Sequence, residues 1–172
     1  MEIYLRALCA EDYKLTYLWR NDREITDLLG GNTYFVSEER EKKWVENSIL
    51  SDRINLHLII CLQTNNQPIG MVNLANIDYL NRKTAFSIQI GAKDYHGKGI
   101  GKQATQLALE HAFYQLNLNK IYLTVLKDNE RAIKLYKSMN FSADGTLREE
   151  LYKNGKFHSL IIMSILRSEF NV

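Results

Sequence analysis

The sequence predicts a mixed α/β domain, of the α+β kind, in which helices pack on a central mixed sheet. Segments with the period of strands alternate along the chain with segments that have the period of helices. Two passages run from a strand through a helix to another strand. The last two strands are joined by Asn154-Gly155, which is a strong hairpin signal. With 172 residues, the chain has the length of one domain, and we expect a single domain over residues 1–172.

The first part of the chain is predicted to contain a strand and two helices. Residues 3–8 have strand character, and residues 11–19 place their apolar side chains along one side of a helix. Gly30-Gly31-Asn32 then indicates a break in regular structure. Ser37 is followed by two glutamates, which predicts a capped helix start, and this helix is expected to end near Leu50.

A hairpin is predicted next in the chain. Residues 55–63 alternate their side chains between two faces, as a strand does. One face carries Leu56, Leu58, Ile60 and Leu62, and the other carries His57, Ile59 and Cys61. A polar turn at 64–67 leads into a second strand at 68–77. Cys61 is expected to be a buried, inert thiol.

Strands and helices alternate in the second half of the chain. The predicted strands cover residues 83–90, 120–126, 141–151 and 157–166, and the predicted helices cover residues 100–112 and 128–139. Asn140 suits the end of the second helix, because asparagine tolerates a left-handed backbone. The whole order predicts about seven strands and about four helices. We expect the passages around Gly99 and Asn129 to supply the parallel pairings of the sheet.

Composition excludes several classes of function. The charge is nearly balanced at +2 and no block of like charges occurs, so nucleic-acid binding is not expected. No apolar run approaches the ~20 residues of a membrane helix. The start of the chain lacks a secretory pattern, so no membrane association and a cytoplasmic location are expected. Cys9 and Cys61 lack metal-ligand spacing, and no metal site is expected.

Glycines occupy alternate positions in segment 95–102, between a predicted strand and a predicted helix. Glycines allow the backbone to approach a ligand closely, and free amides at a helix start favour an anion such as pyrophosphate. Gly97 and Gly101 enclose three residues, whereas a P-loop needs four. The G-x-G-x-G spacing also differs from the dinucleotide pattern G-x-G-x-x-G. A glycine-rich turn without a ligand stays the alternative interpretation.

A second motif lies about 30 residues later, from Asn129 to Phe141. By itself it has a plain packing explanation, and Tyr136 alone would be interpreted as a core aromatic. Together, however, the two segments resemble the GNAT superfamily of amine N-acetyltransferases. The family loop Q/R-x-x-G-x-G/A is matched by His96-Gly97-Lys98-Gly99-Ile100-Gly101. The family element N-x-x-A-x-x-L-Y-x-x-x-G-F is matched from Asn129, with Asn140 in place of the glycine.

The resemblance is densest over residues 83–141 and is closest to the spermidine and ribosomal-protein acetyltransferases. It implies a mostly antiparallel GNAT sheet that is splayed at the coenzyme site, with acetyl-CoA as cosubstrate and no metal. It implies that Tyr136 is the catalytic acid that protonates the departing thiolate. The implied coenzyme-binding residues are Gln89, Ile90, Gly91, His96, Gly97, Lys98, Gly99, Ile100, Gly101, Lys102, Asn129, Ala132 and Tyr136.

The resemblance assigns these residues distinct roles. Backbone amides from Gln89 to Gly91 would hold the pantetheine arm and polarise the thioester carbonyl. Amides from Gly97 to Lys102 would bind the pyrophosphate, and the Asn129 side chain would fix the coenzyme arm. His96 stands where the family has Gln or Arg, and coenzyme binding is expected to survive this change, because the main contacts of the loop are backbone amides.

The acceptor implied by the resemblance is a primary amine of a small molecule, either a polyamine or a (nucleotide-linked) amino sugar. Phe86 occupies the place of the acid that serves as base in many relatives, so the general base is not identified. The base could be a relayed water or another residue, or it could be absent if the acceptor is less basic. The polar residues His57, His158, Asp78, Glu149 and Glu150 are available, but each is interpreted as a solvated or structural polar group. Residues 28–33 lack the acidic side chains of spermidine-type relatives, and Arg20 could meet a phosphate or be a plain surface charge.

Two other functions stay open at this point. The acceptor could be a protein N-terminus, as in ribosomal-protein acetyltransferases. Alternatively, the chain could bind acetyl-CoA as a non-catalytic sensor, with Phe86 marking a lost base; the intact Asn129 and Tyr136 argue against a sensor. A homodimer is expected only because dimers are common among related proteins.

Overall fold

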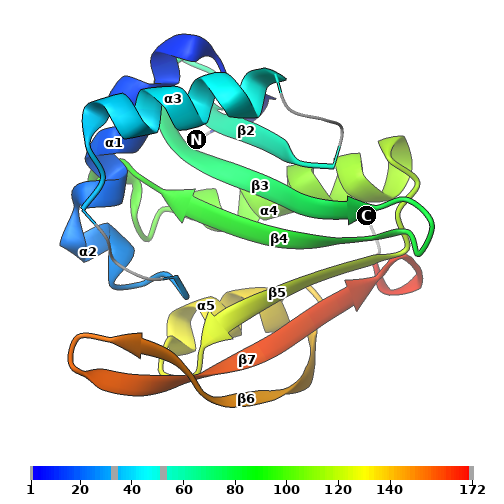
Figure 1. The fold of residues 1–172 in the computed structure, drawn as a ribbon. Coiled ribbons are helices and arrows are strands. Elements are labelled where there is room, and N and C mark those ends of the chain that lie inside the picture. The colour runs from blue at the N-terminus through cyan, green and yellow to red at the C-terminus, as the bar shows by residue number, and fades with distance from the viewer. Residues whose placement is uncertain (1, 32–34, 51–53, 171–172) are drawn as a thin grey trace.

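The computed structural model describes residues 2–31, 35–50 and 54–170, which form a seven-stranded sheet with helices packed on it (Figure 1). The strands are β1 (Ile3–Ala7), β2 (Leu56–Leu62), β3 (Pro68–Asp78), β4 (Lys83–Ile90), β5 (Lys120–Leu126), β6 (Ser142–Lys153) and β7 (Lys156–Leu166). The α-helices are α1 (Tyr13–Asn21), α2 (Arg23–Thr26), α3 (Glu38–Leu50), α4 (Ile100–Glu110) and α5 (Glu130–Lys137). Asn32 of the predicted break lies outside the described residues.

The strand order is β1-β2-β3-β4-β5-β7-β6, and every neighbouring pair is antiparallel except β4 with β5. These two strands pair only from Lys83 opposite Lys120 to Ala85 opposite Tyr122. Because β4 continues to Ile90 and β5 to Leu126 without further pairing, the strands diverge, as Figure 1 shows. The prediction of a mostly antiparallel, splayed sheet is confirmed.

One predicted pairing is wrong. The passage around Asn129 does not supply a parallel pair, because β7 lies between β5 and β6 and pairs antiparallel with both. The physical reason is the tight turn between β6 and β7, where Asn154 (φ 50°) and Gly155 (φ 80°) both adopt left-handed backbone. This turn folds β7 back along β6, and β7 then fills the position beside β5.

The two faces of the sheet bury separate cores. The face that carries α4 and α5, here called the α4 face, buries Ile60 and Leu62 of β2 together with Phe86. The opposite face, here called the α1 face, buries Ile59 and Cys61 with residues of α1, α2 and α3. The predicted alternation of β2 between two faces is therefore confirmed, and the Cys61 thiol is fully buried.

Helix ends follow the predicted capping chemistry. The Ser37 hydroxyl accepts a hydrogen bond from the Arg40 amide at 3.2 Å, so the capped start of α3 is confirmed. Asn140, just beyond α5, has φ 65°, as expected for a left-handed residue after a helix. The four-residue helix α2 and the π-helical segment His111–Gln115 were not predicted, because both are too short to establish a period.

Three further observations concern the described residues only. None of their helices is long and apolar enough to cross a bilayer. They contain no group of three or more His, Cys, Asp or Glu side chains placed to hold a metal ion. Cys9 is an exposed free cysteine.

Candidate active site

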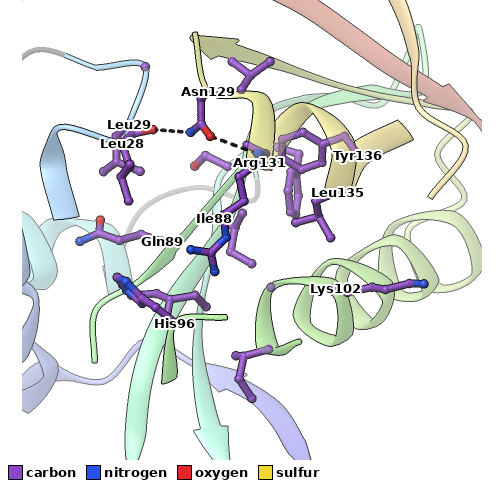
Figure 2. A pocket seen from close by; sticks show the side chains of 18 of the residues that line it. Leu28, Leu29, Ile88, Gln89, His96, Lys102, Asn129, Arg131, Leu135 and Tyr136 are labelled. Atoms are coloured by element: carbon purple, nitrogen blue, oxygen red, sulfur yellow. Dashed lines mark hydrogen bonds between the residues drawn. The ribbon is translucent and has the colours of Figure 1, made fainter. Parts of the chain in front are cut away.

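A cavity of about 890 Å³ opens where β4 and β5 diverge (Figure 2). Its walls come from both strands, from the start of α4, from α5 and from the loop after α2. Eleven of the thirteen residues predicted to bind coenzyme line it: Gln89, Ile90, His96, Gly97, Gly99, Ile100, Gly101, Lys102, Asn129, Ala132 and Tyr136. Gly91 and Lys98 are not among the lining residues. Two motifs separated in sequence thus meet at one site.

The glycine loop forms the entrance to α4. Gly97 (φ 79°) and Gly99 (φ 78°) have left-handed backbone, which a side chain would strain. Gly99 caps the helix, and its carbonyl oxygen accepts the Lys102 amide at 3.1 Å. The Lys102 amide therefore already makes a bond within the first turn of α4, and its predicted contact with pyrophosphate stays a prediction. The amides at the first positions of a helix have no partner within it, so this end of α4 suits an anion.

Three cationic residues line the cavity: Lys102 of α4 and Arg131 and Lys134 of α5. The Lys102 side chain points along α4 away from Arg131 (Figure 2), and Lys134 also pairs with Glu130 at 3.3 Å. The Arg131 guanidinium reaches the glycine loop, since its Nη2 lies 3.8 Å from where a Cβ on Gly97 would be. No lining residue within the described part of the chain is acidic. The charges and the helix start together suit a multiply charged anion such as a diphosphate.

The backbone at the end of β4 is only partly available. In an antiparallel pair, every second residue directs its amide and carbonyl to the partner strand. The Gly91 amide donates to the Ile69 carbonyl oxygen at 2.8 Å, so the prediction that this amide holds the pantetheine arm is wrong. Ile90 and Ile88 lie at the alternate positions of the strand, so their amide and carbonyl groups point away from β3 and towards the gap. His96 confirms this direction, because its Nε2 lies 2.9 Å from the Ile90 carbonyl oxygen.

Gly91 has a packing role instead. A Cβ placed on this residue would lie 2.0 Å from Cδ2 of Trp19, a side chain that is almost fully buried on the α1 face. Because the backbone fixes the position of a Cβ atom, no side-chain rotamer at residue 91 could relieve this contact. The glycine is therefore required so that β4 can pass closely over α1.

Tyr136 lies on α5 and faces Phe86 of β4. Their ring centroids are 6.4 Å apart with the planes nearly perpendicular, and the Phe141 ring also packs against Tyr136, with a centroid distance of 5.5 Å. Burial of Tyr136 raises the pKa of its phenol to about 12. The group therefore holds its proton at neutral pH. A phenol at the cavity wall that stays protonated can donate a hydrogen bond or a proton, and cannot act as a base.

Asn129 connects α5 with the loop after α2. Its Oδ1 accepts the Ala132 amide at 3.1 Å and caps α5, and its Nδ2 donates to the Leu28 carbonyl oxygen at 3.1 Å (Figure 2). The side chain keeps one donor hydrogen and one acceptor lone pair for a ligand. The contact of Asn129 with the coenzyme arm stays a prediction. The structure shows in addition that the same side chain makes two hydrogen bonds within the protein.

The α1 face of the gap carries uncharged polar side chains, of which Asn73 and Ser87 were not predicted from the sequence. Asn73 of β3 lies opposite Ser87 of β4, its Nδ2 donates to the Ser87 Oγ at 3.1 Å, and both residues line the cavity. His57 Nδ1 is 2.7 Å from Asn73 Oδ1. Gln89 shares this face, and its buried Nε2 has no hydrogen-bond partner. The alternation of polar and apolar residues along β4 was the available signal for Ser87.

None of the five residues considered for the general base lines the cavity. His57 reaches it only through Asn73. His158 bonds the Lys153 carbonyl oxygen at 3.2 Å, and Asp78 bonds the amide of Asn81 at 2.8 Å. Glu149 and Glu150 are exposed on β6. Phe86, in the place of the family acid, is 4% exposed, so this wall of the site is apolar.

Arg20 does not reach the cavity. Its Nε lies 3.4 Å from Oε2 of Glu41, and its guanidinium carbon lies 4.5 Å from the centre of the Trp44 ring. Glu41 is fully buried, although its place near the start of α3 suggested a solvated helix acid. Arg20 therefore serves as the counter-ion of a buried carboxylate, which explains it without a phosphate.

Known proteins share this architecture. The acetyltransferase (GNAT) domain family matches residues 2–142. Spermidine N(1)-acetyltransferase of Escherichia coli (strain K12) is 33% identical over 168 residues, which cover 94% of this chain and 89% of that protein. A putative ribosomal N-acetyltransferase of Bacillus subtilis (strain 168) is 35% identical over 101 residues, 59% of this chain and 55% of that protein.

Solved structures agree with these sequence matches. The crystal structure of spermidine N-acetyltransferase from Vibrio cholerae in complex with CoA and spermine has a TM-score of 0.90 and 31% identity, covering 97% of this chain and 96% of that one. The predicted fold and family are confirmed. The chain belongs to the GNAT family of acetyltransferases and is an acyltransferase that moves an acetyl group from acetyl-CoA to an amine.

Proposed function

We propose that the protein acetylates a small primary amine of the polyamine class, and that coenzyme and acceptor enter the gap from opposite faces of the sheet. The observation that carries the proposal is the gap between β4 and β5. The start of α4, its neighbouring cations and Tyr136 border the gap on the α4 face. Asn73, Ser87 and Gln89 border it on the α1 face.

The α4 face fits acetyl-CoA. The diphosphate would lie at the start of α4, near Lys102 and Arg131, where helix amides and cationic side chains favour an anion. The pantetheine arm would run along β4, where the Ile88 and Ile90 backbone groups face the gap. Binding in this direction would deliver the thioester to Tyr136. Holding both reactants in one gap converts a two-body reaction into a positioned attack.

The chemistry requires two proton movements. The nitrogen of the neutral amine attacks the thioester carbon, a carbon–nitrogen bond forms, and the carbon–sulfur bond then breaks. The departing thiolate takes a proton from the Tyr136 phenol, which is regenerated from solvent. The nitrogen releases its proton to water, since no acidic side chain of the described residues lines the cavity. An alkylamine with pKa about 10.4 is mostly charged at pH 7, so activity should rise with pH.

The relatives support the acceptor class. The Escherichia coli relative is a spermidine acetyltransferase, and the Vibrio cholerae structure contains spermine. The cavity wall of Asn73, Ser87 and Gln89 offers hydrogen bonds rather than charges to such an amine. Because these three side chains include no carboxylate, we expect the acceptor to be held there by hydrogen bonds and not by ion pairs.

An acceptor screen tests the proposal. Thiol release from acetyl-CoA would be followed with spermidine, spermine, amino sugars, nucleotide-linked amino sugars and N-terminal peptides. Turnover that is fastest with a polyamine supports the proposal, whereas preference for a peptide N-terminus replaces it with protein acetylation. Tight CoA binding without turnover of any amine would instead identify a sensor.

A further inference from the structure

Lys153, the last residue of β6, is a buried lysine whose ammonium group is fully used inside the protein. The residue is 5% exposed. Its Nζ donates hydrogen bonds to three carbonyl oxygens: those of Thr26, Leu29 at 2.8 Å and Gly31 at 3.2 Å. An ammonium group has three donor hydrogens, so each carbonyl receives one. The loop after α2 is thus gathered around one side chain from the β6–β7 hairpin.

This arrangement is costly if its only purpose is to fill space. Removing a charged amine from water is unfavourable, and burial lowers the pKa of Lys153. A methionine of similar length would fill the same volume without that cost. What only the ammonium supplies is directional bonding to three carbonyls at once. Its contribution is therefore the fixed course of the loop.

The loop that Lys153 holds is a wall of the active site. Residues 28–31 line the cavity. A Cβ on Gly30 would lie 3.7 Å from the Thr124 carbonyl oxygen, so the loop passes close to the diverging part of β5. The same Cβ would lie 3.9 Å from Cδ2 of Leu160, and Leu160 is paired with Leu126, which alternates with Val125 of the α4 face and therefore points to the α1 face. The loop therefore borders the acceptor side of the gap.

Two flanking bonds complete the attachment. Asn154 Nδ2 donates to Asp27 Oδ1 at 3.0 Å, next to Lys153 on the hairpin. On the other side, the Asn129 side chain donates to the Leu28 carbonyl oxygen. The loop is thus bonded to the hairpin at one side and to α5 at the other, and Lys153 makes most of these bonds.

We propose that Lys153 is a positioning residue for the acceptor amine, which holds residues 26–31 as the acceptor-side wall of the gap. It does not touch the reacting atoms; it acts through the loop. This inference rests on the proposed assignment of the acceptor to the α1 face. It predicts a defect in the use of amine rather than of acetyl-CoA.

The test compares Lys153→Met with Lys156→Met, which removes an exposed lysine from the same hairpin. In Lys153→Met the KM for spermidine should rise about tenfold or more, while the KM for acetyl-CoA changes less than about twofold. Lys153→Gln keeps two donor hydrogens and should give an intermediate KM for spermidine. If Lys153→Met does not fold, Lys153→Gln replaces it in the comparison with Lys156→Met. Lys156→Met should match the wild type in both constants.

A second readout is independent of activity. Hydrogen exchange of the amides of residues 26–31 should accelerate in Lys153→Met, or in Lys153→Gln, and not in Lys156→Met. Unchanged exchange there would overturn the inference even if the wild type acetylates no amine. With an active wild type, an unchanged KM for spermidine, or an equal rise in both KM values, would overturn it while leaving the proposed function intact. A wild type that binds CoA without acetylating any amine would instead reject the proposed function, and the exchange result alone would then decide whether Lys153 holds the loop.

Discussion

His96 Nε2 lies 2.9 Å from the carbonyl oxygen of Ile90, so the residue that opens the glycine loop is bonded to the last residue of β4. A carbonyl oxygen only accepts, so Nε2 carries the proton in this contact. The bond fixes the loop relative to the strand along which the pantetheine arm is proposed to run. It also explains how histidine replaces the Gln or Arg of the family pattern, since all three side chains supply an N–H donor.

Replacing this donor should weaken coenzyme use. His96→Ala is expected to raise the KM for acetyl-CoA about fivefold, as the loss of one hydrogen bond of ~1 kcal/mol predicts, with little change in kcat. His96→Gln should restore most of the affinity, because its amide can donate to the same oxygen. Steady-state kinetics with acetyl-CoA as the varied substrate would show this. An alanine variant equal to the wild type would contradict the role.

Removing the phenol of Tyr136 should slow the chemical step. Tyr136→Phe is expected to lower kcat about 100-fold, the scale of a lost general acid, with the KM for acetyl-CoA nearly unchanged. The pKa of about 12 is higher than the usual value of a tyrosine, so the phenol keeps its proton well above pH 10. The kcat of the wild type should therefore not fall between pH 7 and 10 through loss of this proton.

The control for this prediction is Tyr152→Phe, on the exposed β6–β7 hairpin, where the ring contacts Phe157 at 5.1 Å and does not line the cavity. It should retain the wild-type rate. A Tyr136→Phe variant with normal kcat would remove the phenol from the mechanism.

Arg131 should contribute to binding of the diphosphate. Arg131→Ala is expected to raise the KM for acetyl-CoA about tenfold at low salt, and the effect should shrink as salt screens the charge. With acetyl-pantetheine, which lacks the diphosphate, the variant should equal the wild type. Lys98→Ala is the matched control, because the Lys98 Nζ lies over the Tyr95 ring at 5.5 Å and the residue does not line the cavity. If Arg131→Ala raised the KM for acetyl-CoA and the KM for acetyl-pantetheine equally, a contact between Arg131 and the diphosphate would be contradicted.

Gly91 should be essential for stability. In Gly91→Ala the new Cβ would overlap the Trp19 ring, 2.0 Å from Cδ2, and the strand and helix must separate. We expect a loss of about 3 kcal/mol in the free energy of unfolding, measured by denaturant titration. Gly145→Ala, with no atom within 4 Å of the new Cβ and no left-handed backbone, should change stability by less than about 1 kcal/mol. Similar losses in both variants would contradict the packing argument.

Much of the site could be predicted because its residues act through local backbone chemistry. The left-handed Gly97 and Gly99 and the capping Asn129 perform their roles within a few residues of their own positions. Two short motifs therefore sufficed to locate most of the residues that are predicted to bind coenzyme and that line the cavity. Asn73 was missed because its role depends on the register of β3 against β4, which brings it opposite Ser87.

The sequence by itself determined the local elements, the capped helix starts, the final hairpin and the family, since periodicity, turn residues and motif spacing are local properties. The tertiary structure decided that β7 lies beside β5, that Gly91 is required by Trp19, and that Glu41 is buried against Arg20. It also brought Lys153 to the Thr26 carbonyl, 127 positions away in the chain. Such contacts depend on packing and strand register between distant segments, which no local pattern specifies.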